Sequence, residues 1–168
     1  MPYRLAIHPP VLFVSWRGFT VDDLRAIAEQ IAELRMTARR PVAYFSRIPP
    51  GRHVFSEGEQ EVLLGFLRAI LPHCDSIHHV IEGDGFVKSN RLAIVTTLST
   101  RTARPRAFHT HQTLEEGIRS IRAMYGVDLS RPVQSNSEAP PARASGAFRE
   151  AARIVERTRA TTKKGQAR

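Results

Sequence analysis

Short runs of β-branched and aromatic residues recur along the first three-quarters of the chain, and each is bounded by turn residues. Such runs are typical of β-strands. Pro9-Pro10 interrupts the first two and predicts a tight reversal between them. The near-continuous apolar run PVAYFSRI, which begins at Pro41, suits a buried central strand. The predicted strands are 3–8, 11–16, 41–48, 76–82 and 106–110.

Between these strands, apolar residues recur at spacings of three and four, which predicts amphipathic helices. Each such segment opens on a capping residue, namely Thr20, the Ser56–Glu59 capping box and the Thr113–Glu116 capping box. Pro72 and Gly126 are natural stops for the second and last of them. The predicted helices are 20–38, 56–71 and 113–125.

Residues 86–100 fit two structures. LAIVTTL is β-branched enough for a strand, whereas Phe86, Asn90, Ile94 and Thr97 also define one face of a helix. We favour the helix, because the segments on either side are predicted strands and a parallel pair needs a crossover.

The resulting order, β-β-α-β-α-β-α-β-α, predicts an α/β fold: a mixed, mostly parallel sheet of about five strands with about four helices. One domain, residues 1–129, accounts for it. The composition then changes to a Pro/Ser/Ala-rich stretch over 130–146, which we expect to be a disordered linker. Residues 147–168 form a basic tail with a thin apolar face, which we expect to be flexible and helical only on binding.

The net charge of +9 suggests an anionic partner, but it is unevenly distributed. Eight basic residues against three glutamates lie from Pro132 onward, which puts +5 in the tail. The Arg-rich tail is therefore a candidate contact for nucleic acid or an acidic protein surface. Only three basic residues are lysines, however, so a coding bias toward arginine would also explain the charge. The tail residues that would make this contact are Arg149, Arg153, Arg157, Lys163 and Lys164.

Cys74 is the only cysteine, so an intramolecular disulfide is excluded and a reducing cytoplasm fits. No apolar run is long enough to cross a bilayer, and we expect no signal peptide. A Cys74–His73 pair is not expected to be catalytic, since catalytic pairs are assembled by the fold rather than by adjacency in sequence.

Histidines are the best candidates for metal ligands or ligand contacts. His109 and His111 share a strand face, whereas the adjacent His78 and His79 face opposite ways. No helical His-x-x-x-His pattern accompanies them, so we expect strand-end and surface histidines, and we assign no metal and no cofactor. The aromatic residues of the strands are expected to pack in the core rather than line a ligand site. These are Phe13, Trp16, Tyr44 and Phe45.

The Gly83-Asp84-Gly85-Phe86 turn joins a predicted strand to a predicted helix. Its backbone N–H groups are suited to an anion. The Gly-x-Gly-x-x-Gly fingerprint is incomplete, however, and Glu82 and Asp84 disfavour phosphate. A tight turn is the simpler explanation.

The element order, the VIEGDGF junction and the closing segment RAFHTHQTLEEGIRSI resemble the STAS domain (sulfate transporter and anti-sigma-factor antagonist), including its SpoIIAA-like members. The resemblance covers nearly all of residues 1–129 and implies action by partner binding rather than chemistry. The family's Asp-Ser-Ser/Thr-Gly phosphorylation motif aligns with Phe55-Ser56-Glu57-Gly58. Ser56 and Gly58 match, but Glu57 occupies the phosphoacceptor position, so the family's phosphorylation switch is not implied here.

We therefore expect a non-enzymatic, cytoplasmic regulatory or scaffolding protein that acts by protein–protein contact. Its docking surface would comprise Ser56, Glu57, Gly58, Gly83, Asp84, Gly85 and Phe86. One alternative is association with nucleic acid or another polyanion through the tail. The other is a small-ligand or metal binder at the sheet end near His109 and His111.

Overall fold

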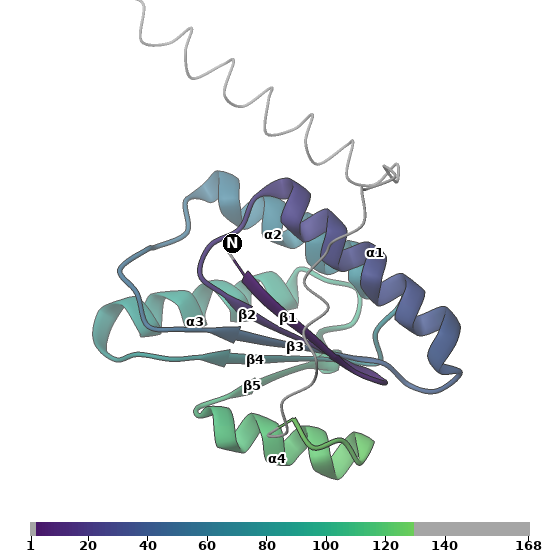
Figure 1. Cartoon of the computed structure of the whole chain (residues 1–168). Helices are drawn as coiled ribbons and strands as arrows, with labels where there is room; N and C mark the ends of the chain where they lie inside the picture. Colours follow the sequence, from purple (N-terminus) through teal and green to yellow (C-terminus); the bar gives the residue numbers. More distant parts are fainter. Residues whose placement is uncertain (1–2, 130–168) are drawn as a thin grey trace, which may run out of the picture.

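The computed structural model describes residues 3–129, which form one five-stranded sheet and four helices (Figure 1). The strands are β1 (Tyr3–His8), β2 (Val11–Trp16), β3 (Ala43–Ile48), β4 (Ser76–Ile81) and β5 (Phe108–His111). The helices are α1 (Val21–Ala38), α2 (Glu57–Ile70), α3 (Gly85–Thr100) and α4 (Leu114–Tyr125). This confirms the predicted α/β class, and residues 86–100 are helical as expected.

The strands lie in the order β1-β2-β3-β4-β5. β1 and β2 form an antiparallel hairpin across Pro9-Pro10, and the remaining neighbours are parallel. Each parallel connection carries a helix, and α1, α2 and α3 all cover one face of the sheet while α4 covers the other (Figure 1). The carboxyl ends of β2, β3, β4 and β5 consequently lie at one edge.

The alternating side chains of the strands divide the core into two parts. Leu12, Tyr44 and Ile77 point toward α1–α3 and belong to the larger cluster. Phe45 and Val80 point toward α4 and pack with Ile121 in the smaller one. β4 is buried along its whole length, so it contributes to both.

The capping predictions hold for the first two helices. Thr20 and Ser56 each accept a hydrogen bond from the backbone three residues on and receive the reciprocal carboxylate contact. Thr113 also caps α4, but the carboxylate of Glu116 accepts instead from the backbone of Gln112, at 2.9 Å. The last capping box is therefore only half formed.

Two strands begin two residues later than predicted, and the ends of β4 and β5 each differ by one residue. β3 begins at Ala43, because Pro41 has no N–H and the Val42 N–H donates to the Asp75 carboxylate, at 2.8 Å. β5 begins at Phe108, because residues 105–107 form a 3₁₀ turn in which the Ala107 N–H bonds to the Arg104 carbonyl.

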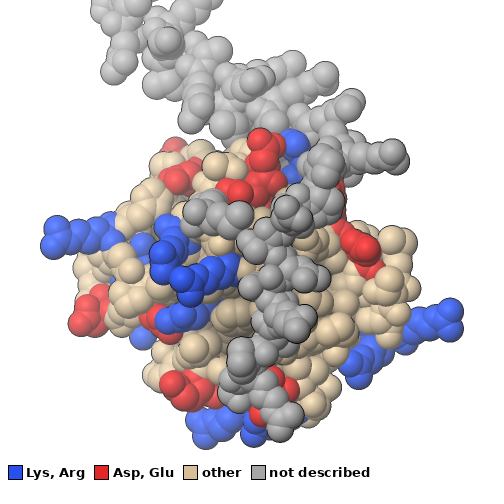
Figure 2. All heavy atoms as spheres, in the orientation of Figure 1, with Lys and Arg blue, Asp and Glu red and all other residues tan. Residues whose placement is uncertain are grey.

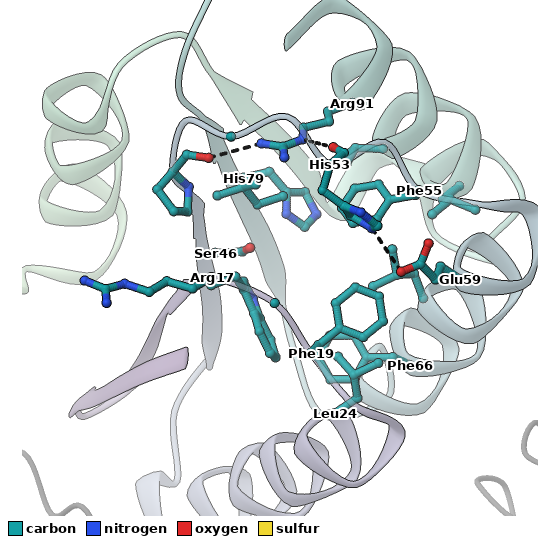
Figure 3. Close-up of a pocket in the computed structure, with 18 of the residues that line it drawn as sticks. Arg17, Phe19, Leu24, Ser46, His53, Phe55, Glu59, Phe66, His79 and Arg91 are labelled. Atoms are coloured by element: carbon teal, nitrogen blue, oxygen red, sulfur yellow. Dashed lines mark hydrogen bonds and ion pairs between the residues drawn. The ribbon is translucent and has the colours of Figure 1, made fainter. Parts of the chain in front are cut away.

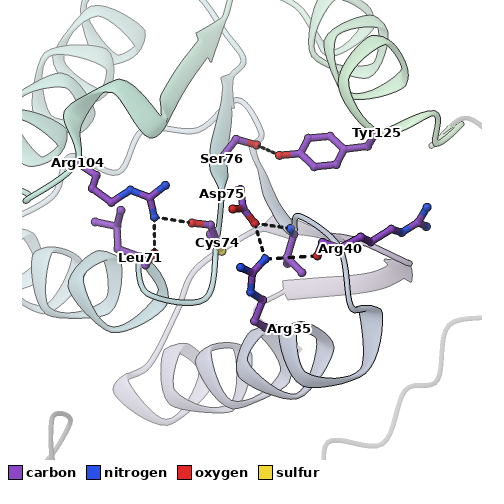
Figure 4. A network of polar contacts seen from close by, with 9 residues as sticks. Arg35, Arg40, Leu71, Cys74, Asp75, Ser76, Arg104 and Tyr125 are labelled. Atoms are coloured by element: carbon purple, nitrogen blue, oxygen red, sulfur yellow. Dashed lines mark hydrogen bonds and ion pairs between the residues drawn. The ribbon is translucent and has the colours of Figure 1, made fainter.

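Polar contacts hold the opposite edge of the sheet, at the amino-terminal end of β4 (Figure 4). The Asp75 carboxylate accepts from the Arg35 guanidinium at 2.7 Å as well as from Val42. Arg104 donates to the carbonyls of Leu71 and Cys74. These contacts fix the connection between α2 and β4, and they lie at the far edge from the site described next.

Candidate functional site

A cavity of about 720 Å³ lies between the sheet and helices α1–α3. It opens at the carboxyl ends of β2 and β3, where Trp16 and Ile48 are the last strand residues. The segments that follow these strands, 17–19 and 49–55, contribute to its rim. In open α/β sheets this edge is the usual place for a ligand, and the volume falls in the range of small-molecule pockets.

The wall of the cavity is mostly apolar and aromatic (Figure 3). Phe19 follows β2, Phe55 precedes α2, and Phe66 lies within α2. Leu24, Leu63, Leu67, Val95 and Leu98 add aliphatic surface from the three helices. Such a lining favours the apolar body of an organic molecule.

A few polar groups interrupt this lining. On the sheet, Ser46 of β3 and His79 of β4 are paired in register and lie side by side. Figure 3 shows His79, Ser46 and Arg91 around one end of the cavity, with Phe19, Leu24 and Phe66 at the other. The cavity therefore has a polar end and an apolar end.

His79 is the most informative of these residues. It is only 5% exposed, yet neither ring nitrogen has a hydrogen-bond partner among the residues that the structure describes. Burial is the main reason why its pKa falls to about 4, and the nearby His111 lowers it further. The ring is therefore neutral at neutral pH, with one N–H donor and one acceptor that no described residue satisfies.

The rim carries a hydrogen-bonded carboxylate. Burial alone would raise the pKa of Glu59, but the hydrogen bonds from Ser56 and the contact with His53 outweigh it, so the net shift is downward. The His53 Nε2 atom lies 3.0 Å from Glu59 Oε1. Glu59 is thus an ionised part of the α2 cap, which leaves arginines as the excess charge around the cavity. Figure 2 shows basic side chains gathered on the side of the visible face where these strand ends lie.

His78 lies on the opposite face of β4 in a complete hydrogen-bond chain. Its Nε2 atom is 2.9 Å from Ser76 Oγ, and its Nδ1 atom is 2.9 Å from His111 Nε2. Ser76 Oγ in turn lies 2.6 Å from the Tyr125 hydroxyl of α4. The ring of His78 stacks on those of His109 and His111. The chain joins β4, β5 and α4.

The histidine prediction was therefore right about orientation and wrong about environment. Adjacent His78 and His79 do face opposite ways, but both are buried rather than on the surface. His109 and His111 share a face, and His111 is bonded to His78. Within residues 3–129, no three histidine, cysteine or acidic side chains are arranged to hold a metal ion.

The prediction that the strand aromatics pack in the core rather than line a ligand site has a different outcome on each face of the sheet. Phe13 and Phe45 pack against each other in the α4-side core, as expected. Trp16 and Tyr44 are buried but also line the cavity, joined by a 3.0 Å hydrogen bond from the indole N–H to the phenol oxygen. Cys74 is buried, and burial raises its thiol pKa to about 12, which makes it a poor nucleophile.

The seven predicted docking residues are all exposed and lie at the carboxyl edge of the strands, beside the cavity. Gly83 and Gly85 have positive φ angles, which confirms the tight turn. Gly83 packs near Pro50, in the segment that leads to Ser56. Phe86 is 78% exposed. The tail contacts, Arg149, Arg153, Arg157, Lys163 and Lys164, and the 130–146 linker lie outside the described residues.

Sequence reasoning missed the cavity, Arg91 and the role of His79. The signal present in the sequence was the long connection 49–55 after a central strand, at the edge where α/β sheets bind ligands. No helix within residues 3–129 has the length and apolar character required of a membrane span. No family model, curated protein or solved structure matches this chain. The STAS resemblance therefore stays a prediction.

Proposed function

We propose that this protein is a non-enzymatic binding module that holds a small, largely apolar organic molecule in the cavity between the sheet and helices α1–α3. The observation that carries the proposal is the pair of unpartnered nitrogens on buried His79. A buried polar atom without a partner costs about 1–3 kcal/mol. A ligand that bonds to His79 recovers this cost.

The surroundings of His79 support binding rather than turnover. A catalytic histidine is usually held by an orienting carboxylate and paired with a nucleophile. Among residues 3–129, no side chain hydrogen-bonds to His79. The single cysteine supports a cytoplasmic setting for this function.

The test uses Trp16, which is the only tryptophan and lines the cavity. The probe is 8-anilinonaphthalene-1-sulfonate, an aromatic molecule whose emission rises in apolar sites. We expect saturable binding with a change in Trp16 fluorescence. Ser46→Phe fills the cavity from the sheet and should abolish the response. Ser15→Phe is the matched control, because Ser15 pairs with Arg47 on the opposite face.

Equal dye binding by Ser46→Phe and the unmodified protein would contradict the proposal, provided that thermal unfolding shows both to be folded. Absence of saturable binding by the unmodified protein would contradict it as well.

A second candidate function is the partner contact expected from the sequence, and exposed Phe86 favours it. An aromatic side chain at the first turn of α3 exposes a large apolar surface, which is typical of contact residues. A photo-cross-linking amino acid at position 86 should then give a discrete cross-linked product in cells. The same group at exposed Met36, on α1, is the control. No product from position 86, or equal products from both, would reject this contact.

A further inference from the structure

Arg91 places a buried positive charge at the polar end of the cavity. Its side chain is 5% exposed. The Nε atom donates to the His53 carbonyl at 2.9 Å, and Nη1 donates to the Pro49 carbonyl at 3.1 Å. These bonds hold the 49–53 segment over the cavity and fix the orientation of the guanidinium.

Within the described part of the chain, this guanidinium has no counter-charge. No carboxylate of residues 3–129 forms an ion pair with Arg91, although it lies among the cavity-lining residues. Its Nη2 atom forms no hydrogen bond within the same residues and lies beside Gly51, 3.2 Å from where a Cβ atom would stand. A buried charge without a counter-charge is costly, so an anion at this point is favourable.

Resting on the proposed function, we infer that the cavity binds an amphipathic monocarboxylate. Its carboxylate accepts hydrogen bonds from Arg91 Nη2 and from the N–H of His79. Its apolar body lies against Phe19, Leu24 and Phe66. The polar and apolar ends of the cavity match the two ends of such a molecule (Figure 3).

The number of buried charges distinguishes a carboxylate from a phosphate. Arg91 supplies one buried cation, and His79 supplies a neutral donor. Arg17 and Arg52, also on the rim, are exposed, so their charges are screened by water. One buried guanidinium balances a monoanion and leaves a dianionic phosphate monoester uncompensated.

The experiment compares ligands that share one apolar body and differ in the head group. Decanoate, decanol, decylamine and decyl phosphate are titrated below their micelle concentrations, with Trp16 fluorescence and calorimetry as readouts. We expect decanoate to bind about tenfold more tightly than decanol, since a hydrogen bond between charged groups is stronger than one to a neutral hydroxyl. Decylamine and decyl phosphate should bind more weakly than decanoate.

Variants assign the preference to its residues. Arg91→Met should remove the preference for decanoate over decanol while decanol still binds. Arg91→Lys keeps the charge and should retain part of the preference. This variant controls for a change in the 49–53 segment that Arg91 holds. His79→Leu should reduce the preference for decanoate over decanol by several-fold. Arg119→Met is the charge-matched control, because Arg119 is exposed on α4, across the sheet from the cavity.

The outcomes separate the two proposals. Equal binding of decanoate and decanol overturns the monocarboxylate and leaves the apolar binding module standing. Tighter binding of decyl phosphate or decylamine also overturns it. A preference for decanoate that survives Arg91→Met removes Arg91 from the site. Failure of all four ligands to bind overturns both proposals.

Discussion

His78 and His79 are neighbours on the same strand, are both buried, and differ in one respect. On the α4 side, His78 uses both ring nitrogens, bonding to Ser76 and His111. On the α1–α3 side, His79 faces a cavity and bonds to no described residue. A buried histidine that is fully bonded stabilises the fold, whereas one without partners is costly until something outside the chain bonds to it.

The same contrast extends to the packing of the two faces. α4 approaches the sheet so closely that Gly117 leaves no room for a side chain beside Phe45. α1, α2 and α3 enclose a volume large enough for a drug-sized molecule. One face is therefore a closed core, and the other is a core with a binding site in it. Each of the following predictions tests this difference.

The largest expected effect comes from exchanging the two histidines for apolar residues. His78→Ala takes one hydrogen-bond partner from Ser76 and one from His111 and creates a cavity, so the free energy of unfolding should fall by about 3 kcal/mol. His79→Leu removes polar atoms that have no partner and should change it by less than about 1 kcal/mol, or raise it. Urea unfolding measures both. Losses of equal size would show that the two faces do not differ.

Gly117→Ala tests the closeness of the α4 face. A Cβ atom here would stand 2.7 Å from Phe45 Cζ, closer than packed carbon atoms come. We expect a loss of about 1–3 kcal/mol from overpacking, measured by thermal unfolding. Gly58→Ala is the control, since nothing lies within 4 Å of its Cβ position and it lies in the first turn of α2, on the open face. A neutral Gly117→Ala would indicate that α4 is loosely held.

The pH dependence of stability also tests the two histidines, because it reports how many protons the unfolded chain binds that the folded protein does not. Burial, with a smaller contribution from neighbouring histidines, lowers the pKa of His78 to about 3 and that of His79 to about 4, against an ordinary value of 6.5. As the pH falls below 6.5, the unfolded chain takes up protons that the folded state excludes, so stability falls. Each histidine contributes up to about 1.4 kcal/mol per pH unit.

Urea unfolding from about pH 6.5 down to about pH 5 measures how steeply the free energy of unfolding falls with pH. Most carboxylates titrate below this window. The free energy of unfolding should fall less steeply with pH in His79→Leu than in the unmodified protein, by the equivalent of up to one proton. Arg119→Met should leave this slope unchanged. A slope unchanged in His79→Leu would contradict a buried, neutral His79.

The smallest effect is expected from the end of the chain of hydrogen bonds. Tyr125→Phe removes the 2.6 Å contact with Ser76 and keeps the ring. Because this hydroxyl is only partly buried, water can replace it, and the cost should be about 1 kcal/mol by urea unfolding. A loss as large as that of His78→Ala would mean that the tyrosine, rather than the histidine, holds the chain together.

Local patterns were sufficient to predict the fold. Apolar spacing and capping residues located α1, α2 and α4, and the need for a crossover settled residues 86–100 in favour of α3. The late start of β5 comes from a local 3₁₀ turn, whereas that of β3 depends on a partner far away in sequence. In β3, the Val42 N–H donates its hydrogen bond to the Asp75 carboxylate. Alternation also predicted that His78 and His79 face opposite ways.

The candidate site could be predicted only in part. The predicted docking segments were assigned to a helix cap and a glycine turn, and the structure contains both. The cavity could not be found in the same way, since Phe19, Ser46, Phe66, His79 and Arg91 come from separate elements and meet only after packing. Burial of His79 depends on the helices that cover its strand. The pairing of Arg91 with carbonyls rather than a carboxylate is likewise a tertiary property.

The most direct test of the account is a ring-¹⁵N NMR titration of histidine-labelled protein with decanoate. We predict that the resonances of His79 move as the carboxylate bonds to its N–H, and that those of His78 stay in place. If decanoate binds and the His79 resonances do not move, or if both histidines shift equally, the ring nitrogens of His79 are not the ligand contact and the central claim is wrong.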